Sequence, residues 1–381
     1  MAPANASRPT HHTPGYVLTD HGLVTRLGDG TEVWGDFAID PHGGEHVLTA
    51  RFIAGKRNDD LRYYSRHAHD KHFSEQQLSL PIGRTYPVET LISVNGKHVF
   101  TVFDTRTGVW TAQTPIGSHH LPRPRLAARC TKTDCGAEVP FAVAGAIALP
   151  RNRLAILARV GDGSPMQLYV GTPGRAFSRS HQSAELDPYL SDAIFRRDPV
   201  TGEELIVGEH IGVPDTAVVV SRQPGGHWSS PRQIATLPFG VGAESYRIAD
   251  AAASDGRVVV ALAQNDVPAN PAYAPIELVT RTKAGTWSPP TRPAHVTVHD
   301  VEPHVALSHS GGRLVLAFDR RLGGRGSRGT IRSESLHGGS WSRLTTLTPH
   351  PTHEVISALA LAKHNRPVVA FSRYRNGAEE D

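Results

Sequence analysis

Short apolar runs recur along the chain at a nearly constant spacing. In each unit a first apolar run, a glycine or asparagine turn and a second apolar run precede a charged loop and a polar segment. Runs this short, rich in Val, Leu and Ile and bounded by turn residues, predict strands rather than helices. The second runs begin 51 to 56 residues apart, at Val47, Val99, Leu154, Leu205, Val258, Leu314 and Val368. The pattern therefore predicts seven similar units built from short strands.

A tryptophan marks four of these units. A residue that repeats with the fold has a repeated structural task, and a large flat ring can fill the gap between neighbouring sheets. We therefore expect these tryptophans to be structural, with stacking on a sugar ring as the alternative. The sequence Gly-x-Trp-Ser/Thr occurs at Trp110, Trp228, Trp287 and Trp341, and Phe73 and Phe177 take the same place in two other units.

Repeats of about 50 residues with four short strands each are typical of a β-propeller. Seven units predict an all-β, seven-bladed β-propeller formed by a single domain over residues 15–381. The seventh unit ends early, so strands at 16–19 and 23–26 would complete it, and N- and C-terminal strands would together close the ring. We expect residues 1–14 to form a disordered tail and residues 118–140 to be an excursion between two blades.

Composition and charge exclude several classes of protein. Gly and Pro together make 65 of 381 residues (36 + 29), which favours many short elements over long helices. The net charge is only +4 and no segment is a basic block, so nucleic acid is not an expected partner. No apolar run reaches the length of about 20 residues that a membrane-spanning helix needs. Histidine is unusually frequent, with 22 residues.

The N-terminus and the two cysteines point to export. The triplet Ala4-Asn5-Ala6 is similar to the end of a signal-cleavage site, which predicts a mature secreted, extracellular protein; a short disordered leader is the alternative. Cys130 and Cys135 flank a small polar loop, so we expect a disulfide between them, with two free thiols as the alternative. No further ligands at metal spacing lie near these cysteines, so we expect no zinc site there.

One turn suggests a family. Ser221 to Trp228 (SRQPGGHW) resembles the Asp-box of sialidase-like (BNR) β-propellers, with Gln223 in place of the Asp and His227 in place of the Thr, and residues 282–287 are a looser copy. The Asp-box is a structural turn, so the resemblance implies the fold over residues 31–375 more than an activity. The seven-bladed propellers that this sequence resembles also include polysaccharide lyases. These enzymes use a His or Tyr as base and acid, and an Arg or His to neutralise a uronate carboxylate.

Carboxylates begin the first apolar run of six units. These runs would form the innermost strands, which line the central channel. Each acid could simply accept hydrogen bonds from backbone N–H groups of a neighbouring loop. Converging carboxylates could instead perform acid–base chemistry on a glycosidic bond, or they could bind Ca²⁺. We expect no cofactor other than this possible Ca²⁺. The residues are Asp36, Glu89, Asp192, Asp250, Glu302 and Glu354.

The candidate site residues follow from these resemblances. We expect catalytic residues among Glu244, Tyr246, Arg247, Asp250, Glu302 and His304, because a Glu–Tyr pair with an Arg resembles a sialidase site and a neutral His or Tyr suits proton abstraction. We expect substrate-binding residues among His210, His353, Arg320, Arg321, Asp36 and Glu89. A second cluster of tyrosines and basic residues lies at Tyr63, Tyr64, Arg66, His67 and His69.

These observations predict a secreted, monomeric enzyme that cleaves acidic oligo- or polysaccharides at the channel mouth, as a polysaccharide lyase or an exo-glycosidase. A non-catalytic lectin-like protein and a protein-interaction propeller are the alternatives. The candidate residues differ from blade to blade, which favours one site and therefore an enzyme. The sequence has no serine-hydrolase elbow, no Walker loop and no His-Glu-x-x-His motif, so it gives no support for those enzyme classes.

Overall fold

The computed structural model describes most of the chain between residues 11 and 374. The described ranges are 11–13, 16–18, 33–51, 60–80, 87–105, 108–129, 141–160, 166–180, 190–210, 215–237, 246–264, 276–321, 329–348 and 353–374. They are almost entirely β-strand and turn, with one short 3-10 helix at Lys363–Asn365. None of the helices within these ranges is long and apolar enough to cross a membrane.

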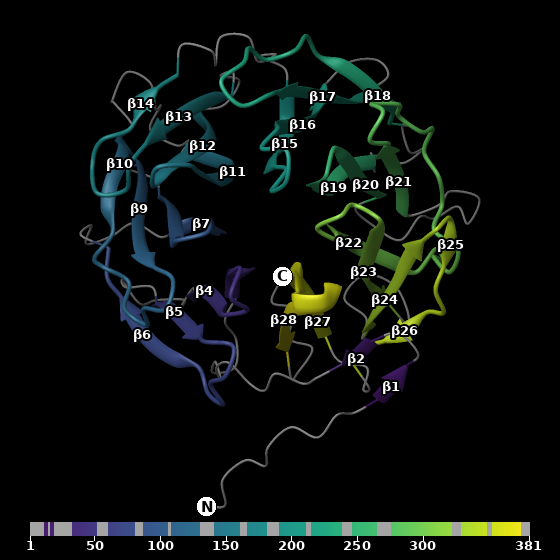
Figure 1. Cartoon of the computed structure of the whole chain (residues 1–381), viewed down its shortest axis with the longest axis horizontal. Helices are drawn as coiled ribbons and strands as arrows, with labels where there is room; N and C mark the ends of the chain where they lie inside the picture. The colour runs from purple at the N-terminus through teal and green to yellow at the C-terminus, as the bar shows by residue number, and fades with distance from the viewer. Residues whose placement is uncertain are drawn as a thin grey trace, which may run out of the picture.

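Six antiparallel sheets and one hairpin surround a central axis (Figure 1). Blade 1 contains β3 (Val33–Ile39), β4 (Glu45–Arg51), β5 (Asp60–Arg66) and β6 (Ser74–Leu78). Blade 2 contains β7 (Pro87–Val94), β8 (His98–Thr105), β9 (Gly108–Pro115) and β10 (Arg125–Arg129). Blade 3 contains β11 (Phe141–Leu149), β12 (Arg153–Val160), β13 (Gln167–Gly171) and β14 (Ser178–Arg179).

The second half of the chain repeats this order. Blade 4 contains β15 (Leu190–Arg197), β16 (Glu204–His210), β17 (Thr216–Arg222) and β18 (Arg232–Thr236). Blade 5 contains β19 (Tyr246–Ser254), β20 (Arg257–Gln264) and β21 (Ile276–Arg281). Blade 6 contains β22 (Asp300–Leu307), β23 (Arg313–Arg321), β24 (Gly329–His337), β25 (Ser340–Trp341) and β26 (Thr345–Thr346). The hairpin is β27 (His353–Ala362) with β28 (Arg366–Tyr374).

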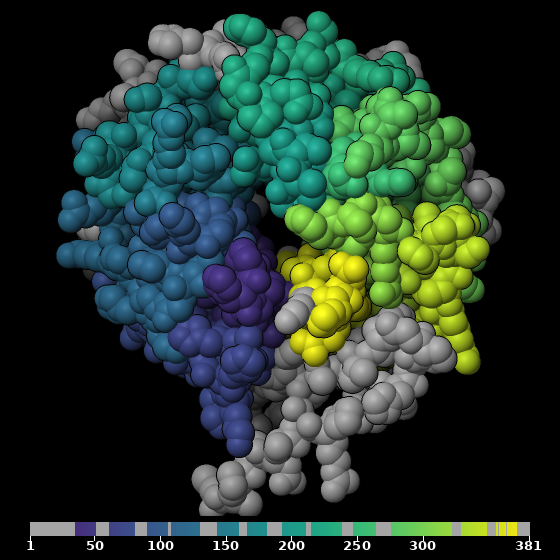
Figure 2. All heavy atoms as spheres, in the orientation of Figure 1, coloured from purple at the N-terminus to yellow at the C-terminus, as the bar shows by residue number. Residues whose placement is uncertain are grey.

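The innermost strands form the wall of the ring. The strands β3, β7, β11, β15, β19, β22 and β27 each contact the next, and β27 contacts β3. Figure 2 shows a hollow at the centre of the ring. Successive residues of these strands point toward alternate sides, and strand edges face the axis. The first halves of the innermost strands therefore lie together at one end of the channel, as the sequence analysis expects.

The prediction of a seven-bladed ring closed by both termini is wrong. Within the described residues six sheets of three to five strands form blades, and the last unit forms only the two-stranded hairpin β27–β28. Strands β1 (His11–Thr13) and β2 (Tyr16–Leu18) pair with each other and add no strand to that hairpin. The repeat in the sequence counts inner hairpins, whereas a blade also needs outer strands, and the described part of the last unit contains none.

Two predicted segments lie partly outside the described residues. The first part of the segment 118–140 forms β10, which is the outermost strand of blade 2. The rest of that segment, with Cys130 and Cys135, lies outside the described ranges, as does the strand expected at 23–26.

The repeated aromatic residues fill the gaps between blades, which confirms the structural interpretation of the four tryptophans. Each lies in or against a core cluster that two neighbouring blades share. Trp228 is buried between blades 3 and 4. The partly buried rings of Trp110, Trp287 and Trp341 pack between blades 1 and 2, 4 and 5, and 5 and 6.

The serine after three of these tryptophans closes the turn that presents the ring. Ser229 N–H donates to the Ser221 carbonyl at 2.8 Å, and the Ser229 hydroxyl accepts from Ser221 N–H at 3.1 Å. Gly225, three residues before Trp228, reverses the chain with a φ of +75°, a conformation that favours glycine. The same pair of bonds joins Ser288 with Thr280 and Ser342 with Ser335.

Bulges interrupt six of the seven innermost strands and re-aim their side chains. In β19 the pairing shifts between Ile248 and Asp250, and in β22 it shifts between Val301 and His304. In β11 the shift lies beside Gly145, where a Cβ would come within 2.9 Å of the Cβ of Phe195 in blade 4. These local shifts set which residues of a strand turn toward the channel and which turn into the core.

Candidate functional site in the central channel

Two aspartates, one buried and one half-buried, join neighbouring innermost strands in the same way. Asp36 accepts from Phe37 N–H at 2.8 Å and from Ile92 N–H of β7 at 2.7 Å. Asp250 accepts from the next residue of its own strand and from Val305 N–H of β22, at 2.8 Å and 3.0 Å. The interpretation that such acids satisfy backbone donors therefore holds for both of them.

Asp250 also binds two side chains that sequence reasoning did not connect. Arg196 Nη2 on β15 donates to Asp250 Oδ1 at 2.8 Å, and His304 Nδ1 on β22 lies 3.6 Å from Asp250 Oδ2. Arg196 Nε donates to the Ala251 carbonyl at 2.8 Å, which fixes the guanidinium against β19. The side chains of Arg196 and His304 are 42% and 21% exposed, so both are accessible from solvent.

The charges around Asp250 keep it ionised. Burial by itself would raise the pKa of Asp250, but the approach of His304 and the positive charge of Arg196 outweigh burial and lower the pKa to about 2. Each carboxylate oxygen already has two close partners, and the side chain is only 11% exposed. Asp250 is therefore a fixed counter-ion that positions Arg196 and His304, and it has little capacity left to take up a proton.

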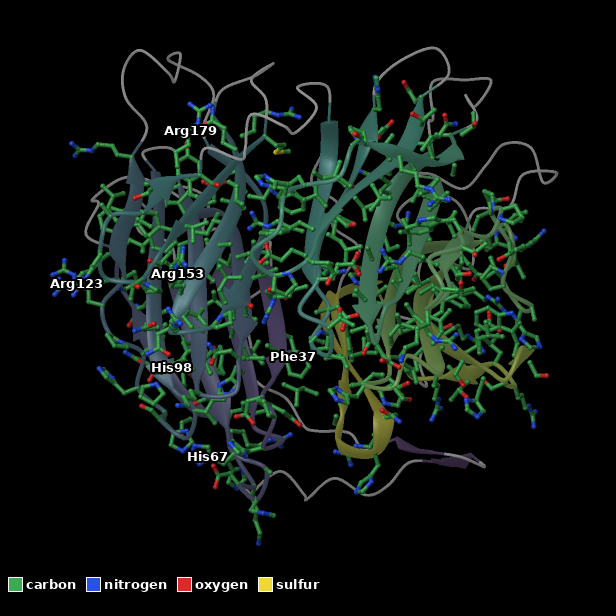
Figure 3. All side chains as sticks on the ribbon, turned by 45° about the horizontal axis from the view of Figure 1, so that its top comes forward. Phe37, His67, His98, Arg123, Arg153 and Arg179 are labelled. Carbon is green, nitrogen blue, oxygen red and sulfur yellow. The ribbon has the colours of Figure 1, made fainter. Side chains whose placement is uncertain are left out.

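The pKa of Asp36 shifts in the opposite direction from that of Asp250. Burial raises the pKa of the Asp36 carboxyl to about 6, although two backbone N–H groups and the charge of Arg196 oppose the rise. The charge of Asp250 acts in the same direction as burial, so Asp36 senses both members of the Arg196–Asp250 pair. Figure 3 shows its chain neighbour Phe37 near the middle of the ring. Two carboxyl groups with pKa values moved apart are typical of sites that divide acid and base roles.

The raised pKa of Asp36 predicts that stability falls as pH rises through about 6. The folded protein holds this proton more tightly than the unfolded chain, so the contribution is complete below the unfolded value of 3.8 and is lost above about 6. The shift corresponds to roughly 2–3 kcal/mol. Urea unfolding from pH 4 to pH 8 should show the wild-type protein losing stability relative to Asp36→Asn. A difference between the two proteins that does not change with pH would contradict this expectation.

A second group of charged residues lies beside His304. Glu302 has a φ of +52°, unusual for a residue with a side chain, within the bulge of β22. Its Oε1 accepts from Arg321 Nη2 at 3.0 Å, while Oε2 is buried without a partner among the described residues. Arg321 also lies 3.6 Å from Asp319. Strained backbone and an unpaired carboxylate oxygen mark Glu302 as a further candidate for substrate contact.

Other predicted residues take structural or separate positions. Arg320 makes two hydrogen bonds of 2.7 Å to Asp300 and another to the His295 carbonyl. Its guanidinium therefore has a structural role in blade 6. Arg247 is exposed on β19, and His210 ends β16. Tyr246, Glu89, Asp192, His353 and Glu354 lie on innermost strands, but their side chains are outside the described parts, as is all of Glu244. From the predicted set, the structure therefore brings Asp250 together with His304 and Glu302 together with Arg321.

The residue that sequence reasoning missed is Arg196. It ends an apolar stretch of β15 (DAIFRR), where an arginine before a turn is unremarkable. Only its contact with a neighbouring blade gives it a role, and 54 residues separate it from Asp250. The repeat length of the chain is the one signal that could have suggested this partnership.

The tyrosine and histidine cluster of blade 1 divides between core and surface. Tyr63 and Tyr64 on β5 are fully buried, and the Tyr63 hydroxyl lies 2.8 Å from His46 Nδ1. Arg66 pairs with Glu45 at 2.6 Å and lies 4.5 Å from the ring of Phe73. Among the described residues one group of three possible metal ligands is present, and it includes His67 and lies outside the channel.

Comparisons with known proteins identify the fold and no family. No protein-family model matches the sequence, and no curated protein matches it. A lectin from Burkholderia pseudomallei is similar in structure, with a TM-score of 0.53 and 13% identity, over 91% of this chain and 96% of the lectin. An ulvan-cleaving polysaccharide lyase is similar with a TM-score of 0.49 and 10% identity, over 76% of this chain and 80% of the lyase. At these identities the similarity shows the fold alone: the chain is a β-propeller with lectin and polysaccharide-lyase structural neighbours.

Proposed function

We propose that the protein cleaves acidic glycans in the central channel by β-elimination. The observation that carries the proposal is the group formed by Arg196, Asp250 and His304, with Asp36 close enough to sense its charges. This group combines a fixed cation, an imidazole with an oriented ring and a carboxyl group that holds a proton near pH 6. Those are the parts that proton abstraction next to a carboxylate needs.

Each residue has a separate role in the proposed reaction. Arg196 neutralises the uronate carboxylate, which makes the neighbouring C5 proton more acidic. His304, with Nδ1 turned to Asp250, uses its other ring nitrogen to remove that proton. The electron pair forms the C4–C5 double bond, the C4–O4 bond breaks, and the protonated Asp36 carboxyl donates its proton to O4. Asp250 acts only through Arg196 and His304 and is a positioning residue.

Hydrolysis by the two aspartates is the weaker interpretation. Two carboxyl groups with pKa values of about 6 and about 2 could serve as acid and nucleophile or base. However, both oxygens of Asp250 are occupied by Arg196, His304 and two backbone N–H groups. A nucleophilic or basic Asp250 would first have to lose some of these contacts. Elimination leaves the contacts of Asp250 in place, because Asp250 only positions Arg196 and His304.

The finer predictions from the sequence belong to this proposal as well. We propose an exported, monomeric protein acting on acidic oligo- or polysaccharides, with Tyr246, Arg247 and Glu302 adding substrate contacts near His304. The sialidase-like resemblance supports a glycan-active propeller in general, and its degenerate motif supports no particular reaction.

Carbohydrate binding without cleavage is the second candidate, favoured by one groove on blade 2. A groove of about 470 Å³ lies away from the innermost strands and is lined by Trp110, Pro122, Arg123, Pro124, Arg125 and Leu126. A partly buried indole beside exposed arginines could bind a sugar ring and an acidic group. Such a surface needs no catalytic group, so it would serve a lectin.

A screen of the purified full chain against acidic polysaccharides and sialosides tests the proposal. Two signals are followed together, namely the ultraviolet absorbance of an unsaturated uronate and the appearance of reducing ends. Elimination is expected to raise both. Reducing ends without absorbance would indicate hydrolysis and overturn the proposed chemistry. Binding of a glycan without either signal would favour the lectin interpretation.

A further inference from the structure

We propose that His67, Asp70 and His119 bind one divalent transition-metal ion, Zn²⁺ in the first instance, between blades 1 and 2. This site is separate from the channel group and from the proposed reaction. His67 and Asp70 lie in the loop from β5 to β6, and His119 lies in the loop from β9 to β10. Figure 3 shows His67 near the lower end of the ribbon.

The three side chains already have the spacing of a ligand set. One possible ligand atom from each residue lies within 4.8 Å of the other two. Asp70 Oδ2 lies 3.3 Å from His67 Nδ1 and 3.6 Å from His119 Nε2, and the two imidazole rings are 4.1 Å apart between centroids. Ligands of a tetrahedral ion bound at 2.0–2.2 Å are separated by roughly 3.3–3.6 Å. The cluster therefore needs little rearrangement to accept an ion.

A second contact holds one ligand in place. His119 Nδ1 lies 2.9 Å from the hydroxyl of Ser65, which is fully buried at the end of β5. When Nδ1 donates to this hydroxyl, the proton is fixed there and Nε2 presents its lone pair to an ion, as partners behind metal-binding histidines usually arrange. Asp70 is held as well, because its Oδ2 accepts from His67 N–H at 3.0 Å.

His67 faces the cluster through Nδ1. Its Nε2 atom is buried and has no hydrogen-bond partner among the described residues, although Nδ1 lies beside Asp70. An ion bound at Nδ1 would place the ring proton on Nε2, so Nδ1 is the ligand atom that His67 offers. The two imidazole rings are tilted by 37° to each other and lie on either side of the Asp70 carboxylate.

The donor set selects the class of metal. Two imidazole nitrogens with one carboxylate suit Zn²⁺ and its transition-metal neighbours, whereas Ca²⁺ and Mg²⁺ prefer oxygen ligands alone. Three protein ligands leave a coordination position for water. Because the ligands come from two blades, the ion would link the β5–β6 loop to the β9–β10 loop. Binding to the folded state alone must stabilise this part of the ring.

The test measures zinc binding by tag-free, chelator-treated full chain with calorimetry and elemental analysis. We expect one Zn²⁺ per chain and a higher Tm with the ion. Asp70→Asn and His119→Gln, both close in size to the native residues, should each weaken binding by at least about tenfold, and Ser65→Ala by about 10–100-fold. Matched controls are His72→Ala and His120→Ala, which remove exposed histidines from the same two loops and should leave the affinity unchanged.

Cobalt gives a readout of the ligands themselves. Co²⁺ in the wild-type protein should show the visible bands of a low-coordinate nitrogen and oxygen site, and these bands should be lost in His119→Gln. Binding that is equally weakened by the two control variants would mean adventitious capture by surface histidines and would overturn the proposal. So would a folded wild-type protein that binds no zinc after chelation.

Discussion

Replacing His304 by Gln is expected to lower the rate of glycan cleavage by about 10²–10⁴-fold. In the proposed reaction the imidazole removes the proton, and an amide of similar size cannot take its place. The residue lies at the bulge of β22 with its Nδ1 atom 3.6 Å from Asp250, and its side chain is 21% exposed. We expect kcat to fall far more than KM rises, because Arg196 would still bind the substrate carboxylate.

The matched control for this variant is His309→Ala. His309 is an exposed histidine in the turn that follows the same strand, at the opposite end from the channel group. We expect it to keep the wild-type rate and the wild-type Tm. If His304→Gln keeps the wild-type rate on the substrate that the screen identifies, His304 is not the base and the proposed site is wrong.

Replacing Asp250 by Ala is expected to lower the free energy of unfolding by about 2–4 kcal/mol, mainly because two backbone N–H groups lose this acceptor. The change removes the acceptor of two backbone N–H groups on neighbouring strands and leaves Arg196 without its counter-ion. Buried donors that lose their only acceptor carry the full cost of desolvation. Asp250→Asn keeps one acceptor oxygen and should lose less. Chemical denaturation at neutral pH measures both variants.

Asp255→Asn is the control for the Asp250 variants. Asp255 pairs with Lys283 at 2.8 Å, but that lysine side chain is 63% exposed, so the pair is a surface interaction. Asparagine also tolerates the φ of +52° that Asp255 adopts in its turn. We expect a change within about 1 kcal/mol. A similarly small change for Asp250→Ala would show that the channel aspartate does not hold neighbouring blades together.

The two channel aspartates show how far a repeat can be interpreted from the sequence. Asp36 and Asp250 open the first apolar run of their units, and the sequence places both on innermost strands that share one end of the channel. The structure confirms that placement and gives both the same bonds to a neighbouring strand. Their pKa values nevertheless move in opposite directions, because burial dominates at Asp36, whose donors among the described residues are backbone N–H groups, whereas Arg196 and His304 lie beside Asp250.

The prediction of seven blades failed for a related reason. The apolar hairpins that mark each unit are determined by local pattern, and all seven inner strands are present. Outer strands are short, for example the two residues of β14 or of β25. Whether such a strand forms depends on pairing with its neighbour, so the apolar spacing does not reveal that the described part of the last unit has no outer strands.

The sequence by itself determined the class of fold, the strands and the structural use of the tryptophans. These features follow from hydrophobic periodicity and turn residues, which act over a few residues. Only the tertiary structure decided the number of blades, the partnership of Arg196 with Asp250 and the meeting of His67 with His119. Those contacts join residues 52 to 54 positions apart, and their energies depend on charge, distance and burial that arise only when blades pack together.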